Sequence, residues 1–66
     1  MQLTVNGDAW SVEEGTSLVG LLEHLGLPVR SVVVELNGTA LLPSEVPSAV
    51  LQDGDVLELV RAVAGG

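Results

Sequence analysis

The chain has 66 residues, no cysteine and one histidine, and it carries nine acidic residues against two arginines, a formal net charge of −7 at pH 7. A chain of this length forms one domain that buries only about 60% of its unfolded surface, so a packed core must supply the stability. Disulfides, thiolate zinc sites and multi-histidine metal sites are excluded. The acidity disfavours nucleic acid and anionic membranes as partners; it fits either attraction to a basic protein surface or simple solubility.

The apolar residues suit a folded chain without a membrane span. They make up 47% of the sequence and are mostly aliphatic, with Trp10 the only aromatic residue. No window approaches the ~18 apolar residues of a membrane helix, and the first residues lack the pattern of a targeting segment. We therefore expect a cytoplasmic protein.

Two short strands joined by a tight turn are predicted at the start of the chain. Residues 2–5 alternate polar and apolar side chains, as a half-buried strand does. Asn6-Gly7 supplies the two positive-φ positions of a hairpin turn. Residues 9–13 then return as a second strand that carries Trp10.

One amphipathic helix is predicted next. Thr16 or Ser17 can cap its free backbone N–H groups. Four leucines follow at spacings that place them within an arc of roughly 100°, which is one buried stripe: Leu18, Leu21, Leu22 and Leu25. His24 points away from this stripe, so we interpret it as a solvent-facing residue and not as a base. Gly26 ends the helix.

The second half of the chain is predicted to contain two or three further strands. Residues 31–36 are strongly β-branched, Asn37-Gly38 turns the chain, and residues 39–42 form a short strand. Prolines and serines interrupt the stretch that follows, so at most one helical turn is expected around residues 44–46. Asp-Gly-Asp then forms a turn before the final strand, which begins at Val56.

This order of elements predicts an α+β fold of the β-grasp (ubiquitin-like) type. A mixed sheet of four to five strands is crossed by one helix, and the first and last strands are central and parallel. We expect one domain over residues 1–66, with a protruding tail over residues 63–66. The side chains predicted to face the core are Leu3, Val5, Val12, Leu18, Leu22, Leu25, Val34, Leu36, Leu57 and Leu59.

The opposite face of the sheet and the last five residues are the candidate functional site. By strand alternation Val33 and Val60 face outward and predict a small apolar docking surface. The chain then loses side-chain bulk through Ala62-Val63-Ala64 and closes on Gly65-Gly66. Because glycine has no Cβ, this end is expected to enter a slot too narrow for other residues. The four residues after Ala62 span at most ~14 Å, enough to place the Gly66 carboxyl in a partner's active site.

Over essentially its full length the chain resembles the ThiS family of ubiquitin-like sulfur carriers. Ser44 and Ala64 depart from the commonest family pattern, since a basic residue and a third glycine are frequent at these positions. The matching stretches are Val5-Asn6-Gly7, Gly15-Thr16-Ser17-Leu18, Leu21-Leu22, Val33-Val34-Glu35-Leu36-Asn37-Gly38, Pro43, Leu51-Gln52-Asp53-Gly54-Asp55-Val56-Leu57-Glu58-Leu59-Val60 and Gly65-Gly66.

The resemblance implies a sulfur donor for thiamine biosynthesis that is not itself an enzyme and binds no cofactor. A ThiF-like enzyme would adenylate the carboxyl of Gly66 with ATP and Mg. A cysteine desulfurase or a rhodanese-type donor would then supply persulfide sulfur, which leaves a thiocarboxylate. A ThiG-like thiazole synthase would take that sulfur for the thiazole ring.

Other functions fit the same carboxyl end. The small subunit of molybdopterin synthase, a MoaD-like carrier, shares the fold but is usually longer. Carriers for cysteine synthesis or tRNA thiolation are further alternatives. A ubiquitin-like modifier would use its activated carboxyl to acylate lysines, whereas a plain interaction domain would not depend on Gly66.

Overall fold

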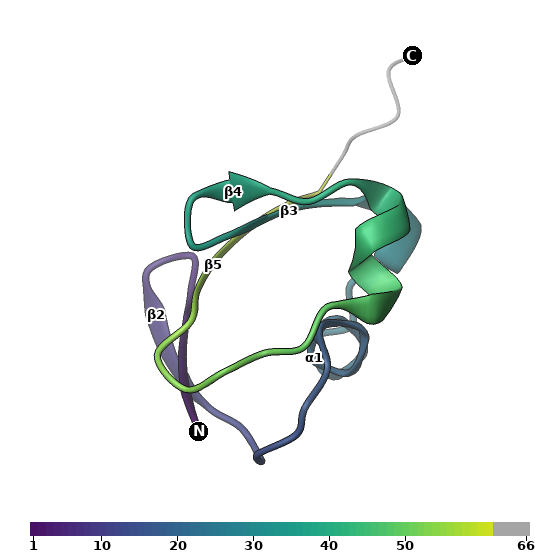
Figure 1. Cartoon of the computed structure of the whole chain (residues 1–66). Coiled ribbons are helices and arrows are strands. Elements are labelled where there is room, and N and C mark those ends of the chain that lie inside the picture. Colours follow the sequence, from purple (N-terminus) through teal and green to yellow (C-terminus); the bar gives the residue numbers. More distant parts are fainter. Residues whose placement is uncertain (62–66) are drawn as a thin grey trace.

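The computed structural model describes residues 1–61, and residues 62–66 lie outside the described part. Within the described part, five strands and three short helical elements follow one another (Figure 1). Their bounds are β1 Gln2–Val5, β2 Asp8–Ser11, α1 Leu18–His24, the 3₁₀ helix η1 Val29–Ser31, β3 Val32–Leu36, β4 Thr39–Ala40, the 3₁₀ helix η2 Pro43–Ser48 and β5 Val56–Arg61.

The strands form one mixed sheet in the order β2-β1-β5-β3-β4. β1 and β5 are parallel, with Thr4 opposite Val56, and all other neighbours are antiparallel. The helix α1 covers one face of this sheet (Figure 1). The predicted β-grasp fold is therefore confirmed, including the adjacent and parallel first and last strands.

Both predicted Asn-Gly turns are present. Asn6 and Gly7 have φ values of 50° and 85°, and Asn37 and Gly38 have φ values of 52° and 82°. A two-residue hairpin with positive φ at both positions matches the right-handed twist of the strands that it joins. These dipeptides therefore set the register of β1 with β2 and of β3 with β4.

The helix α1 begins where a side chain satisfies its first free donors. The Gly20 N–H donates to the Ser17 Oγ at 3.0 Å, which makes Ser17 the N-cap. The Thr16 hydroxyl instead donates to the Glu13 carbonyl oxygen at 2.6 Å. Of the two predicted caps, Ser17 is therefore the one that the structure selects.

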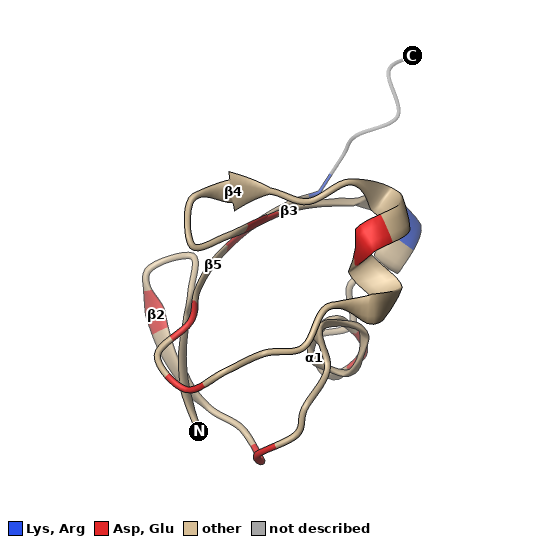
Figure 2. Ribbon diagram, in the orientation of Figure 1, with Lys and Arg blue, Asp and Glu red and all other residues tan. Residues whose placement is uncertain are grey.

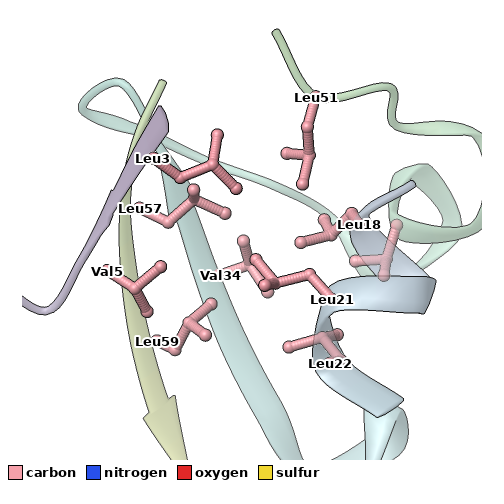
Figure 3. Close-up of a cluster of buried hydrophobic side chains, with 10 residues drawn as sticks. Leu3, Val5, Leu18, Leu21, Leu22, Val34, Leu51, Leu57 and Leu59 are labelled. Carbon is pink, nitrogen blue, oxygen red and sulfur yellow. The ribbon is translucent and has the colours of Figure 1, made fainter. Parts of the chain in front are cut away.

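The core lies between α1 and the sheet. Figure 3 shows the leucines of α1 pointing toward apolar side chains of β1, β3 and β5. Of the residues predicted to face the core, Val12, Leu25 and Leu36 are only partly buried and the others are buried. Among residues 1–61 the buried hydrophobic residues are Leu3, Val5, Leu18, Leu21, Leu22, Val34, Val46, Leu51, Leu57 and Leu59.

The stretch between β4 and β5 is more ordered than predicted. η2 spans six residues, where at most one turn around residues 44–46 was expected. The Glu45 carboxylate accepts a hydrogen bond of 2.7 Å from the Leu42 N–H, and Pro43 at the start of the helix has no N–H that would need an acceptor. Val46 is 4% exposed and anchors the segment in the core. The prolines and serines of this segment predicted an irregular stretch, because the burial of Val46 depends on tertiary contacts that the local sequence does not show.

Some predicted strand boundaries were also wrong. β2 covers Asp8–Ser11 and not residues 9–13, although the Val12 N–H still donates to the Met1 carbonyl oxygen at 2.9 Å. β3 starts one residue later than predicted because η1 precedes it. β4 stops at Ala40, since the chain bends into η2 soon afterwards. Within residues 1–61 no helix is long and apolar enough to cross a membrane.

Candidate functional site: the last strand and the open sheet face

β5 carries the chain through the middle of the sheet to its edge. It lies between β1 and β3, and its last residue, Arg61, is still paired with Val32. The predicted site residues Ala62, Val63, Ala64, Gly65 and Gly66 lie outside the described residues, so their roles stay predictions. The part of the site that the structure brings together is the strand leading to them and the sheet face beside it.

The start of β5 is fixed by the second Asn-Gly turn. The Val56 N–H donates to the Asn37 Oδ1 at 2.9 Å, and the Asn37 Nδ2 donates to the Asp55 Oδ1 at 2.9 Å. The other carboxylate oxygen of Asp55 accepts from the Gln52 N–H at 2.7 Å. These bonds hold Asp53-Gly54-Asp55 as a turn, so the predicted turn before the last strand is confirmed.

The two valines predicted for docking are direct cross-strand neighbours. Val33 on β3 pairs with Val60 on β5, and they are 51% and 59% exposed. Their side chains lie on the face opposite α1, because the alternate residues Val34 and Leu59 are buried against the helix. The structure thus brings the predicted pair together on the open face, next to the end of β5.

Leu42 extends this apolar surface and was not predicted as part of it. Glu35 pairs with Ala40, and the Leu41 N–H donates to the Val34 carbonyl oxygen at 2.9 Å. Continuing this antiparallel register places Leu42, 64% exposed, beside Val33 on the open face. Continuing the alternation through the predicted strand 39–42 would have found it. We call the row Leu42, Val33 and Val60 the open-face patch.

An acidic pair lies next to the open-face patch. Glu35 and Glu58 are cross-strand partners, and both are exposed on the same face as Val33 and Val60. Figure 2 shows acidic segments on β3 and β5. Like charges directly opposite each other destabilise a sheet. The open face therefore combines half-exposed valines with a repulsive carboxylate pair, and the carboxylate pair opposes folding.

The helix side of the molecule offers less chemistry. His24 is exposed at the end of α1, as predicted, and it lines a hollow of about 500 Å³ together with Glu13 and Thr16. Across residues 1–61, no three His, Asp or Glu side chains gather closely enough to hold a metal ion.

The fold and the site define a ubiquitin-like β-grasp protein whose central strand β5 ends at Arg61 beside an apolar patch. The sequence model of the ThiS family matches residues 2–66. The chain is 45% identical over 53 residues to the sulfur carrier protein ThiS of Thermus thermophilus, which covers 80% of this chain and 83% of that protein.

A solved structure and a longer protein are also similar. The crystal structure of the thiamine biosynthesis protein ThiS from Geobacter metallireducens matches with a TM-score of 0.84 at 35% identity, over all of both chains. The thiazole synthase of Magnetococcus marinus is 36% identical over 66 residues, but the chain spans only 20% of its length. The chain belongs to the ThiS family.

Proposed function

We propose that this chain is the sulfur carrier for thiazole formation in thiamine biosynthesis and that the carboxyl of Gly66 holds the sulfur. The observation that carries the proposal is the match of the ThiS family to residues 2–66, which includes Gly65-Gly66. The 45% identity to a protein named as a sulfur carrier supports it. With no cysteine in the sequence, a side-chain persulfide is not available, which leaves the carboxyl end as the attachment point.

The proposed chemistry begins with activation, because a free carboxylate is a poor electrophile. A ThiF-like enzyme transfers AMP from Mg-bound ATP to the Gly66 carboxylate and releases pyrophosphate. A persulfide on a cysteine desulfurase or rhodanese-type donor then attacks the carbonyl carbon and expels AMP. A thiol reduces the resulting S–S bond and leaves a thiocarboxylate, whose sulfur passes to thiazole synthase.

In this cycle the chain acts as a carried substrate and not as an enzyme. The acid, base and oxyanion donors belong to its partners. A cytosolic location, where ATP is available, completes the proposal. Cell fractionation tests it: the chain is expected in the cytosolic fraction, and finding it with the membrane or outside the cell would contradict this location.

The folded body serves as the docking element for the adenylating enzyme. The open-face patch offers apolar area next to the end of β5, and Glu35 and Glu58 beside it offer negative charge. The expected complementary surface is an apolar recess with Arg or Lys at its rim. Opposite charges across such an interface accelerate encounter and fix orientation.

Thiazole synthase is the proposed acceptor of the sulfur. Two proteins of that name, from Magnetococcus marinus and Paramagnetospirillum magneticum, contain a stretch that aligns with all 66 residues at 36% and 33% identity. A carrier-like stretch within such a protein supports a direct encounter between carrier and synthase.

The test is thiazole formation in a reconstituted pathway with the full chain and with a chain that ends at Gly65. The proposal predicts product with the first chain and only background with the second. Equal product from both chains would show that the reaction does not need the carboxyl of Gly66. Circular dichroism of both chains serves as the control for folding.

A further inference from the structure

The side chain of Asn6 bonds both backbone polar groups of Leu59. The Leu59 N–H donates to the Asn6 Oδ1 at 2.7 Å, and the Asn6 Nδ2 donates to the Leu59 carbonyl oxygen at 3.1 Å. Both bonds are partly buried, and they join residues that are 53 positions apart in the sequence. The first Asn-Gly turn is therefore tied to the last strand by its side chain as well as by its backbone.

The direction of the hydrogen bonds along β5 explains why Leu59 needs this partner. The Val56 carbonyl oxygen accepts from the Asn37 N–H, so alternate residues from Val56 onward point their backbone groups toward β3. Leu57 and Leu59 then point theirs toward β1, and the Leu57 carbonyl oxygen accepts from the Asn6 N–H at 2.9 Å.

The chain of β1 turns away at Asn6 and Gly7, one step before it would reach Leu59. In a longer parallel pair, the next two bonds of the ladder would come from the β1 backbone. Here one carboxamide supplies both of them, an acceptor and a donor in the same plane. Asn6 thus extends the pairing of β5 on the β1 side beyond the point where β1 itself ends.

We infer that Asn6 is a positioning residue, which keeps Leu59 and the residues that follow it in the sheet and so fixes the point from which the Gly66 carboxyl is presented. The inference rests on the proposed function, because the position of the end of β5 matters for activity only if the Gly66 carboxyl reacts in a partner's active site. Without the carboxamide, the end of β5 is held only by its β3 neighbours. Fraying of residues 59–61 adds about three freely moving residues ahead of Gly66, which lowers the effective concentration of the carboxyl at an active site.

Asn37 is the matched control that the fold provides. It has the same residue type, the same kind of turn and nearly the same φ, 52° against 50°. Its Oδ1 also accepts from a β5 N–H, that of Val56 at the start of the strand. Replacing either asparagine with glycine keeps the positive φ at no steric cost and removes the side-chain bonds. The added backbone freedom of glycine is the same in both variants, so the comparison cancels it.

The experiment compares Asn6→Gly and Asn37→Gly in the full chain, at a temperature where both are folded. Amide hydrogen exchange by NMR is expected to show the Leu59 N–H exchanging at least about tenfold faster in Asn6→Gly than in Asn37→Gly, since each lost hydrogen bond shifts local opening by up to about tenfold. Pyrophosphate release by the adenylating enzyme is expected to show a kcat about two- to fivefold lower for Asn6→Gly, with little change in KM.

A third variant, Asn6→Asp, keeps the acceptor for the Leu59 N–H and loses the donor to the Leu59 carbonyl oxygen. We expect it to fall between the unsubstituted chain and Asn6→Gly in both measurements. Equal Leu59 exchange or equal kcat in the two glycine variants overturns the positioning role while leaving the proposed function intact. Failure of the enzyme to adenylate the unsubstituted chain overturns the proposed function, and the inference with it.

Discussion

The two faces of the sheet follow the same strand alternation but meet different demands. On the face covered by α1, Leu57 and Val34 are 0% and 1% exposed and contact other aliphatic side chains. On the open face, Val60 and Val33 are more than half exposed and lie next to a pair of like charges. Folding alone accounts for the first arrangement. The second arrangement is the surface that we propose a partner covers.

The largest expected effect comes from truncating the covered face. Leu57→Ala removes a fully buried side chain from the centre of the core and should lower the free energy of unfolding by about 2–5 kcal/mol. Val60→Ala, three residues later on the open face, should change it by about 0.5 kcal/mol or less. Urea denaturation followed by Trp10 fluorescence measures both. Similar losses in the two variants would contradict the division of the sheet into a folding face and a docking face.

The open face should matter for association. The double variant Val33→Thr/Val60→Thr keeps β-branched side chains of similar volume but makes the open-face patch polar. We expect unfolding free energy within about 1 kcal/mol of the unsubstituted chain and affinity for the adenylating enzyme weaker by about tenfold. Isothermal titration measures the affinity. Unchanged binding would show that the enzyme contacts another surface.

Removing the N-cap of α1, the helix on the covered face, should cause a smaller loss of stability. Ser17→Ala removes the acceptor for the Gly20 N–H and should destabilise the fold by about 1 kcal/mol. Affinity for the adenylating enzyme should not change, since α1 lies on the opposite face (Figure 1). Thr16→Ala is the matched control, because Thr16 does not cap the helix. An equal loss of stability in both variants would show that Ser17 is not the residue that caps the helix.

The smallest expected effect comes from the acidic pair. Glu58→Gln removes the repulsion with Glu35 and should stabilise the fold by about 0.2–0.5 kcal/mol. The same change should slow association with the adenylating enzyme at low salt, and high salt should reduce the difference. Stopped-flow association rates measure this effect, with Glu23→Gln on α1 as the control. Identical association rates for both variants would show that the charges of the open face do not steer association.

The sequence was sufficient for the elements whose signals are local. The two Asn-Gly turns, the leucine stripe that starts at Leu18 and the parity of Val33 and Val60 all follow from short-range patterns, and together they give the topology. The anchoring of Val46 and Leu51 in the core depends on a segment that is irregular in sequence and ordered only by tertiary contacts. The bonds from Asn6 to Leu59 link opposite ends of the chain, so no local pattern could indicate them.

The candidate site was predicted in part. The valine pair is where alternation placed it, whereas Leu42 was missed because the strand 39–42 was not followed across to Val33. The roles of residues 62–66 stay predictions, since they depend on a partner's active site as much as on this chain.

The most direct test of the central claim is the fragment mass spectrum of the chain after incubation with the adenylating enzyme, ATP, Mg, a persulfide donor and a thiol. Our account predicts that one oxygen is replaced by sulfur and that the fragment holding the change ends at Gly66. An unchanged mass, sulfur located elsewhere in the chain, or amide-linked adducts with lysines of other proteins would contradict it.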